Sequence, residues 1–321
     1  MNTILLYYKY VPIADPVAFM ASHKALCEHL GFKGRIIVSK EGINGTFEGT
    51  SAAVDEYIHL MRTDPELAPL FADTHFKKST GTPDGTAFKR LSIKVRPEIV
   101  SGHLHEKDSA TGDVNPNEVT GKRLSPETLH QWFKEGRKFE IVDMRNDYEH
   151  ESGHFRGSIL PPLSNFRDLP LAAAQLEQRG LKEKTVLTVC TGGVRCEKAS
   201  GYLVKKGFKD VYQLDGGIVS YMEKYPGQDF LGSLYVFDGR VTMDFVPPEA
   251  RATKTIVGRC KLCSSPSEHY VNCGNVLCHM HFICCLDCVS KAEAKGDEAL
   301  CKNCLTLQIP QAHVPSSSGQ L

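Results

Sequence analysis

The sequence has no excess charge of either sign, no long apolar run and few cysteines outside one short segment. Its 38 basic residues balance 38 acidic ones, so a surface for nucleic acid would have to be local rather than global. No apolar run approaches the ~20 residues that a membrane-spanning helix needs. Residues 1–9 lack the basic start and the cleavage site of a signal peptide. We therefore expect a cytoplasmic protein without a membrane partner.

Redox-cofactor motifs are also missing. The sequence has no glycine-rich fingerprint for a flavin or a nicotinamide, and no set of two histidines and one carboxylate indicates an iron site. The sequence therefore identifies no electron donor, and it gives no indication of an oligomeric state.

The 321 residues are enough for two or three domains. In residues 1–100, the order strand, helix, two strands, helix and strand predicts a ferredoxin-like α+β domain, with a turn at residues 42–45. Strands and helices alternate in residues 123–226, which predicts a parallel α/β domain. The other segments are predicted to be a linker at residues 101–122, a hairpin connector at 227–257, a cysteine-rich module at 258–308 and a disordered tail at 309–321.

The main candidate for chemistry is Cys190, where a strand-like run turns into a helix-like one. A glycine pair follows it and lets the backbone curl with its N–H groups turned inward. The helix N-terminus and Arg195 add positive charge, which favours a thiolate. We therefore expect a nucleophile of lowered pKa with Arg195 as a main cause; the alternative is a buried structural cysteine. The rest of the loop is Thr191, Gly192, Gly193 and Val194.

This Cys-x4-Arg loop is shorter than the Cys-x5-Arg loop of tyrosine phosphatases and resembles that of the rhodanese domain, whose cysteine carries a persulfide sulfur. Upstream, Asp143, Arg145 and Glu149 match the rhodanese pattern and are expected to support the site. Downstream, residues 207–217 match its closing strand and turn. Cys196 stands six residues after the nucleophile, and two roles stay open: it resolves an oxidised Cys190 as a disulfide, or it packs in the helix.

Nine of the twelve cysteines lie between residues 260 and 304. Three Cys-x2-Cys pairs stand there, a spacing that lets two thiolates converge on one tetrahedral zinc ion. We expect two structural zinc sites, because so short a segment holds too little apolar surface to fold alone. The pairing stays open, and a metal-free set of thiols is the alternative. The predicted ligands are Cys260, Cys263, Cys273, Cys278, Cys285, Cys288, Cys301 and Cys304, with Cys284 left over and His269, His279 and His281 as substitutes.

A weaker signal lies in the strand-like stretch at residues 88–96. Apolar residues at odd positions alternate with basic residues at even positions, so one face of the strand would be apolar and the other charged. The charged face is a candidate surface for a phosphate backbone, and a solvated strand face is the alternative. The candidate contacts are Arg90, Lys94 and Arg96, joined by Lys77 and Lys78.

Together these motifs resemble the bacterial rhodanese-domain tRNA uridine 5-hydroxylases. The resemblance rests on residues 39–46, 89–94, 190–198 and 236–241, whereas residues 231–234 depart from the family pattern. It implies oxygen-dependent formation of 5-hydroxyuridine at the wobble position of tRNA, with molecular oxygen as co-substrate and tRNA as partner. It also matches the cysteines at 190 and 196 to the two loop cysteines of the family.

Two other classes of function are considered. One is a sulfurtransferase that moves sulfur from thiosulfate or a persulfide to a small thiol or a protein acceptor. The other is a docking module, which the intact loop argues against because docking needs neither Cys190 nor Arg195. The separate front domain favours a large anionic substrate over a small sulfur donor. One route to hydroxylation is attack of Cys190 at C6 of the uracil ring, which would activate C5.

Overall fold

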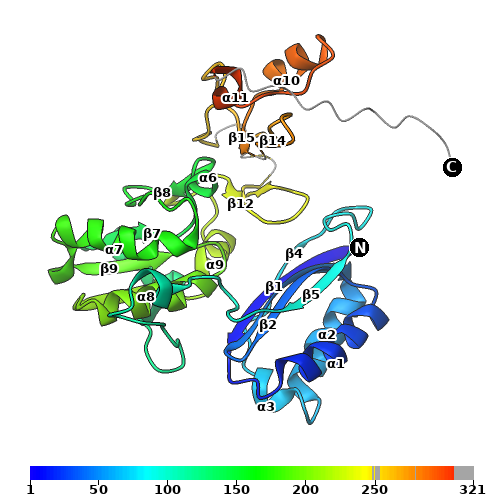
Figure 1. Cartoon of the computed structure of the whole chain (residues 1–321), viewed down its shortest axis with the longest axis vertical. Coiled ribbons are helices and arrows are strands. Elements are labelled where there is room, and N and C mark those ends of the chain that lie inside the picture. The colour runs from blue at the N-terminus through cyan, green and yellow to red at the C-terminus, as the bar shows by residue number, and fades with distance from the viewer. Residues whose placement is uncertain (248, 250–253, 279, 307–321) are drawn as a thin grey trace.

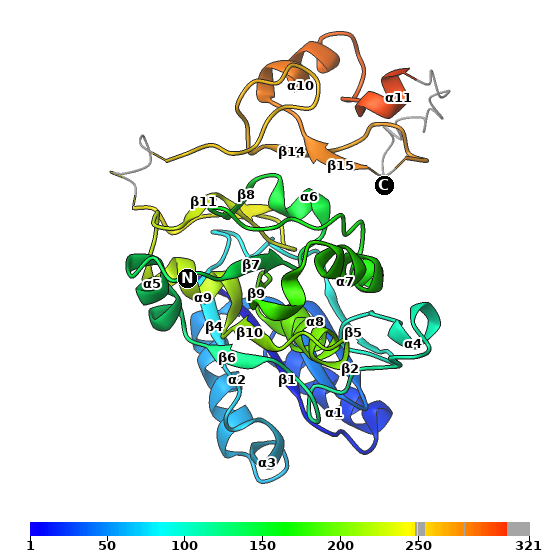
Figure 2. The same cartoon turned by 90° about the vertical axis from the view of Figure 1, so that its left-hand side faces the viewer.

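The computed structural model describes residues 1–247, 249, 254–278 and 280–306, and it has three parts (Figures 1 and 2). A front domain and a central domain lie side by side, and the cysteine-rich module lies above them. The predicted disordered tail and His279 fall outside the described residues. Within the described ranges, no helix has both the length and the apolar character needed to span a bilayer.

The front domain is a five-stranded sheet with helices on one face. Its strand order is β4-β1-β3-β2-β5, and all neighbours are antiparallel except β2 and β5. This arrangement confirms the predicted ferredoxin-like sandwich, which β5 extends at one edge. In Figure 1, α1 and α2 cover the face turned away from the central domain. The elements are β1 (Asn2–Tyr10), α1 (Pro16–His29), β2 (Lys33–Ser39), β3 (Gly42–Thr50), α2 (Ser51–Thr63), α3 (Ala68–Phe71), β4 (Lys77–Thr80) and β5 (Leu91–Val95).

Local sequence explains most of these boundaries. Asp15 accepts hydrogen bonds from the first N–H groups of α1, and Pro16 occupies its first turn. The predicted turn at residues 42–45 is wrong, because those residues belong to β3. Gly45 serves close packing instead: a Cβ atom there would lie 2.7 Å from the Tyr7 ring.

The sheet of the central domain is parallel, as predicted, and its strand order is β6-β10-β9-β7. Its core on one face lies under α7 and α8, and its core on the other face lies under α5 and α9. The elements are β6 (Lys122–Leu124), α5 (Pro126–Lys134), β7 (Glu140–Asp143), α6 (Asp147–His150), β8 (Gly153–Phe155), η1 (Phe166–Asp168), α7 (Leu169–Gln178), η2 (Leu181–Glu183), β9 (Thr185–Val189), α8 (Val194–Lys205), β10 (Asp210–Leu214) and α9 (Gly217–Lys224).

The segments before and after the central domain pack against it. The stretch at residues 101–122 contains α4 (Leu104–Lys107) and buries Leu104 and Val114 in the central core, so it is more ordered than a simple linker. After α9, β11 pairs with β8, and β12 and β13 form a short hairpin. The later elements are β11 (Phe230–Gly232), β12 (Leu234–Tyr235), β13 (Thr242–Met243), β14 (Tyr270–Asn272), β15 (His281–Ile283), α10 (Leu286–Glu293) and α11 (Lys302–Thr306).

Candidate active site and metal sites

Cys190 lies at the carboxyl end of β9, in the loop that leads into α8. The carbonyl oxygens of Cys190 and Thr191 accept hydrogen bonds from the N–H groups of Ile218 and Val219 in α9, at 2.9 and 3.0 Å. Gly193 has a φ of 102°, which side-chain-bearing residues rarely adopt. Its N–H donates to the Cys190 Sγ atom at 3.2 Å. The backbone therefore curls around the sulfur atom.

Arg195 is held beside this loop by Glu149. Its Nη1 and Nη2 atoms donate to the two carboxylate oxygens at 2.5 and 2.8 Å, and Nη2 also donates to Thr191 Oγ1 at 3.2 Å. Glu149 is completely buried. Because a bidentate pair of this kind is strong and directional, the guanidinium group keeps one position.

Asp143 and Arg145 form a second buried ion pair next to the first. Arg145 donates from Nε and Nη2 to the Asp143 carboxylate at 2.9 and 2.6 Å, and both side chains are completely buried. Arg145 also donates to the carbonyl oxygens of Glu149 and Gly153 at 3.2 and 2.7 Å. The structure thus brings all three predicted supporting residues together, because this pair fixes the segment that carries Glu149.

The pKa of the Cys190 thiol is lowered although the side chain is completely buried. Burial raises the pKa of a thiol, but here a hydrogen bond from the Cys196 thiol, the charge of Arg195 and nearby N–H groups outweigh it. Burial and the same contact raise the pKa of Cys196 well above its ordinary value. Cys196 therefore tends to keep its proton where Cys190 loses its own, which adds stabilisation of the thiolate as a candidate role to the two considered from sequence. The charge of Arg195 also lowers the pKa of Cys190, but by less than the contact with Cys196 does.

The front domain covers the loop, which we did not expect from the sequence. A Cβ atom on Gly192 would lie 2.9 Å from Leu6, and one on Gly193 would lie 2.9 Å from the Tyr8 hydroxyl oxygen. The glycines therefore allow β1 to approach closely. One signal was available: β1 carries apolar or aromatic residues on both of its faces, a pattern typical of a strand that is covered on both sides.

Lys77 also contacts the loop, so its expected place in a basic patch with β5 is wrong. It lies on β4, and β4 and β5 are opposite edges of the sheet. Lys77 is buried, and its Nζ atom donates to the Gly192 carbonyl oxygen at 3.0 Å. Burial lowers the pKa of Lys77 to about 8. Lys78 is exposed on the same edge strand and pairs with Asp55.

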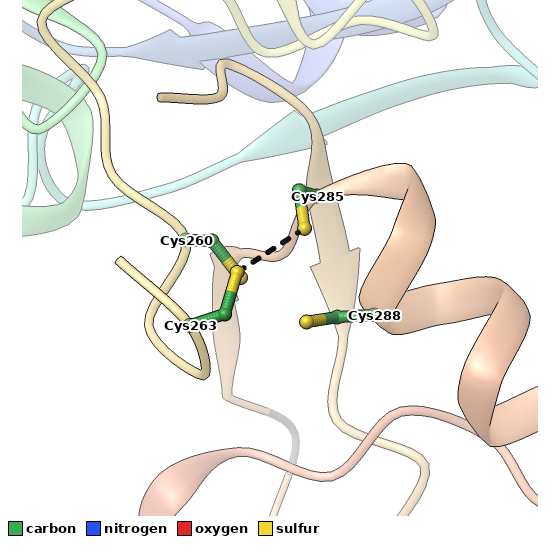
Figure 3. Close-up of side chains that lie close together, drawn as sticks. All are labelled: Cys260, Cys263, Cys285 and Cys288. Atoms are coloured by element: carbon green, nitrogen blue, oxygen red, sulfur yellow. Dashed lines mark hydrogen bonds between the residues drawn. The ribbon is translucent and has the colours of Figure 1, made fainter. Parts of the chain in front are cut away.

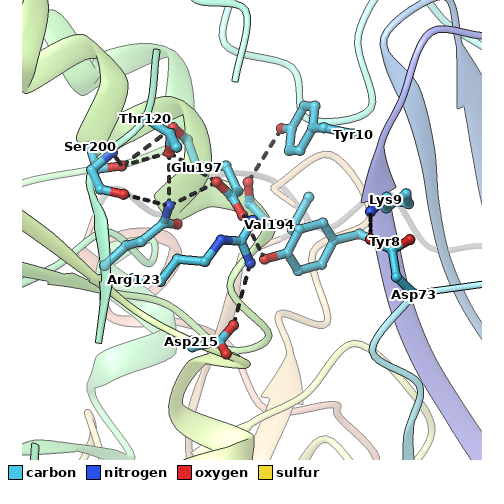
Figure 4. Close-up of polar contacts among 12 residues, drawn as sticks. Tyr8, Lys9, Tyr10, Asp73, Thr120, Arg123, Val194, Glu197, Ser200 and Asp215 are labelled. Atoms are coloured by element: carbon cyan, nitrogen blue, oxygen red, sulfur yellow. Dashed lines mark hydrogen bonds and ion pairs between the residues drawn. The ribbon is translucent and has the colours of Figure 1, made fainter. Parts of the chain in front are cut away.

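Polar contacts between the two domains converge on α8, the helix that follows the loop (Figure 4). The buried Glu197 carboxylate accepts a hydrogen bond from the Tyr8 hydroxyl group at 3.2 Å. The adjacent Lys198 is also buried and pairs with Glu41 and Glu98 at 3.0 and 2.8 Å. Since breaking a buried ion pair leaves an uncompensated charge, these contacts favour one relative position of the domains.

A cleft of about 1680 Å³ lies between the front domain, the hairpin of β12 and β13, α6 and the cysteine-rich module. The hairpin contributes Phe237, whose ring centroid lies 5.8 Å from the Arg195 Cζ atom. The structure brings the three predicted nucleic-acid contacts together on one wall, where all three side chains are exposed. The basic residues of that wall are Arg35, Arg90, Lys94 and Arg96, with Lys89 beside them.

The eight predicted metal ligands form two groups of four. In each group, the four sulfur atoms lie within 4.8 Å of one another. Figure 3 shows the first group, in which two cysteines come from a loop and two from the start of α10. The groups are interleaved along the chain, since the first pair joins the third and the second joins the fourth. They are Cys260, Cys263, Cys285 and Cys288, and Cys273, Cys278, Cys301 and Cys304.

Both groups fit zinc in spacing and in donor type. The Sγ atoms of Cys263 and Cys285 are 3.5 Å apart, and those of Cys278 and Cys301 are 3.7 Å apart. A tetrahedron with Zn–S bonds of ~2.3 Å has edges of ~3.8 Å. Four thiolates and no open position are typical of a structural zinc site rather than a catalytic one.

The other candidate ligands in this module have different partners. The ring of His269 bonds through Nδ1 to the Cys284 carbonyl oxygen at 2.9 Å, and that of His281 bonds through Nδ1 to Asn272 Oδ1 at 3.0 Å. Cys284 is buried and belongs to neither group. These residues therefore do not replace any of the eight cysteines.

A parallel sheet that carries a glycine-rich cysteine loop closed by arginine defines a rhodanese-like protein. Family models agree with this class and divide the chain in three. A "Rhodanese-like domain" matches residues 125–224, a "UPF0176 acylphosphatase like domain" matches residues 2–99, and a "Rhodanase C-terminal" model matches residues 231–305. The acylphosphatase-like match agrees with the sandwich observed in the front domain.

Curated relatives narrow the class to one family. The tRNA uridine(34) hydroxylase of Bacillus velezensis is 42% identical over 283 residues, which are 88% of this chain and 82% of the relative. That of Lactococcus lactis is 43% identical over 87% and 83%, and that of Cytophaga hutchinsonii is 40% identical over 93% and 89%. The chain belongs to this family.

A solved rhodanese-like domain from Anabaena sp. is also similar. It is 19% identical, the match covers 35% of this chain and 80% of that chain, and the TM-score is 0.31. A TM-score this low carries no argument, so the assignment rests on the sequence relatives.

Proposed function

We propose that this chain hydroxylates C5 of the wobble uridine of tRNA in an oxygen-dependent reaction, with Cys190 as the nucleophile. The observation that carries the proposal is the junction between the cysteine loop and the basic cleft: Arg195 contacts Phe237, and Phe237 lines the same cleft as Arg90 and Lys94. The relatives are named for hydroxylation of uridine 34 of tRNA. A tRNA substrate also supports a cytoplasmic location.

The proposed chemistry begins with addition of the Cys190 thiolate to C6 of the uracil ring. The new C–S bond shifts the electrons of the C5–C6 double bond onto C5 and the C4 carbonyl group. C5 then takes one oxygen atom from dioxygen, while two electrons and two protons from a reductant outside the chain convert the other oxygen atom to water. The C5 proton then passes to the new C5 oxygen as the C–S bond breaks, which restores the double bond and releases the thiolate.

The surrounding residues hold the sulfur in the form that this chemistry needs. Cys196 and Arg195 stabilise the thiolate before it adds and after it leaves. Asp143, Arg145 and Glu149 position the guanidinium group. Zinc in the two four-cysteine groups would have a structural role, because it supplies no redox step and the groups leave no open position.

The basic wall is proposed to hold the RNA backbone. Phosphate contacts from Arg90, Lys94 and Arg96 supply affinity and orientation without reading sequence. The selected base is then presented from the cleft toward the loop. An anticodon base suits this arrangement because it is single-stranded and can leave its stack at low cost.

The test is mass spectrometry of tRNA nucleosides from cells in which the Cys190→Ser variant is the only copy of this protein. We expect loss of the nucleosides derived from 5-hydroxyuridine, with thiolated nucleosides retained. Cys27→Ala, which removes a thiol buried in the front domain, is the matched control and should retain both. Loss of thiolated nucleosides with hydroxylated ones intact would decide for sulfur transfer instead.

A further inference from the structure

Phe237 is an exposed aromatic side chain on a tightly anchored loop. It lies between β12 and β13 and is 46% exposed. The next residue, Asp238, has a buried carboxylate that pairs with Arg240 at 2.6 Å. Arg240 in turn donates to the Ser79 hydroxyl group and the Thr80 carbonyl oxygen of the front domain, both at 3.0 Å. The anchor therefore holds the loop that carries the ring against the front domain.

The ring stands where the cleft meets the cysteine loop. The Arg195 guanidinium carbon lies 5.8 Å from its centroid, and the Tyr235 ring packs edge-on at 5.4 Å. Phe237 also lines the same cleft as Arg90 and Lys94. The ring thus lies beside Arg195 of the candidate active site and in the same cleft as the basic wall of the front domain.

An exposed ring in this position matches the way proteins bind single-stranded RNA. Unpaired bases stack on aromatic rings while basic side chains hold the backbone on either side. The exposed face of the ring contributes no free energy of burial while it is in water, and a base stacked on it would bury that face. The fixed loop favours this role further, because a pre-positioned ring loses little conformational freedom on binding.

We propose that Phe237 is the stacking surface for the substrate base, which lies on the ring with its edge toward Arg195 and the Cys190 loop. This inference rests on the proposed function and adds a substrate-positioning residue to it. The occupant is a pyrimidine from a single-stranded loop of RNA. Its flanking phosphates reach the wall that Arg90 and Lys94 form.

Equilibrium binding to two synthetic anticodon stem–loops tests this directly. One RNA carries uridine at position 34 and the other carries an abasic site there. The purified full-length chain should bind the uridine RNA roughly tenfold more tightly than the abasic RNA, in the range measured for stacking. Phe237→Leu should lose that preference while binding the abasic RNA as before, and Phe237→Trp should restore it. Equal weakening of both RNAs by Phe237→Leu, or no weakening, would overturn the proposal.

Two controls separate stacking from a structural effect. Leu171→Ala removes an exposed apolar side chain of the central domain, 57% exposed on α7, and should change neither affinity. The pH dependence of Cys190 alkylation should be the same in Phe237→Leu as in the wild type. A shifted pH dependence would mean that Phe237 acts through Arg195, against the proposal. If the wild type binds neither RNA, the proposed function fails, and this inference fails with it.

Discussion

Cys190 combines two properties that rarely occur together, complete burial and a lowered pKa. The rate at which Cys190 is alkylated is therefore expected to depend on two separate quantities. One is the fraction of thiolate, which Cys196 and Arg195 increase. The other is the access of the reagent to the buried sulfur atom, beside which the front domain packs on Gly192 and Gly193. Only the first quantity depends on the ionisation of Cys190 itself, so a pH profile can separate the two.

Cys196→Ala should raise the pKa of Cys190, because it removes the largest stabilising contact to the thiolate. The rate of alkylation by iodoacetamide, followed by mass spectrometry of the Cys190 peptide, should reach half its plateau at a lower pH in the wild type than in this variant. Arg195→Ala should also move the midpoint upward. A midpoint that is the same in wild type and Cys196→Ala would show that the hydrogen bond does not matter.

The same pKa shift links Cys190 to stability. Between the lowered pKa of the folded state and the higher pKa of the unfolded chain, the folded protein holds a thiolate and the unfolded chain a thiol. Because the unfolded chain binds more protons, stability from this group rises with pH through that window and is lost as the pH falls through the folded-state pKa. Cys196→Ala should therefore reduce the dependence of stability on pH within the window.

At the scale of elements, β5 can expose basic side chains to the cleft because it lies at one edge of the sheet. The other edge, β4, lies against the cysteine loop through Lys77, and its exposed Lys78 is paired with Asp55. The basic side chains of β5, by contrast, line the cleft. The two basic edges of one sheet therefore have different surroundings.

Replacing Arg90, Lys94 and Arg96 together by Ala should weaken tRNA binding and flatten its dependence on salt. Each lost phosphate contact lowers the slope of log affinity against log salt by about 0.7–0.9. Affinities measured by filter binding across a salt series give the slope. Lys78→Ala, on the opposite edge, is the matched control. An unchanged slope in the triple variant would place the backbone elsewhere.

Local patterns in the sequence were enough to predict the sandwich, the parallel sheet and the loop after β9, because each depends on residues close together in the chain. The cover over that loop was not predictable in the same way. Contacts such as Leu6 to Gly192 and Lys77 to Gly192 join distant segments, and no spacing rule reports them. Gly45 led to a wrong prediction of a turn. Its lack of a side chain instead allows the Tyr7 ring to pack against β3.

At the scale of the whole molecule, the cysteine-rich module forms one side of the cleft, so its folding bears on the candidate site. Its pairing could not be read from the sequence, because any two of the four pairs satisfy the spacing of one zinc site. The structure selects the interleaved pairing. The two cysteine pairs that hold one ion are therefore separated in the chain by a pair that holds the other ion. Loss of one ion would for this reason also disturb the site of the other.

Native mass spectrometry of the full chain should show two zinc ions. Because the sites are interleaved, Cys263→Ala should lower the content toward zero rather than to one, whereas Cys284→Ala should keep two ions. Chelation should increase hydrogen exchange in residues 260–304 while the central sheet stays protected, because the ions supply the folding free energy of the module. Metal-free protein with all thiols free and the module still protected would contradict this.

The cover that β1 places over the cysteine loop also bears on the lifetime of the protein. A thiolate is the form of cysteine that peroxides oxidise, first to a sulfenic acid and then irreversibly. Cys190 is completely buried, and Leu6 and Tyr8 lie against Gly192 and Gly193, so we expect this cover to limit the access of such oxidants to the sulfur. The contact that covers the cysteine loop should thus also slow the loss of the nucleophile by oxidation.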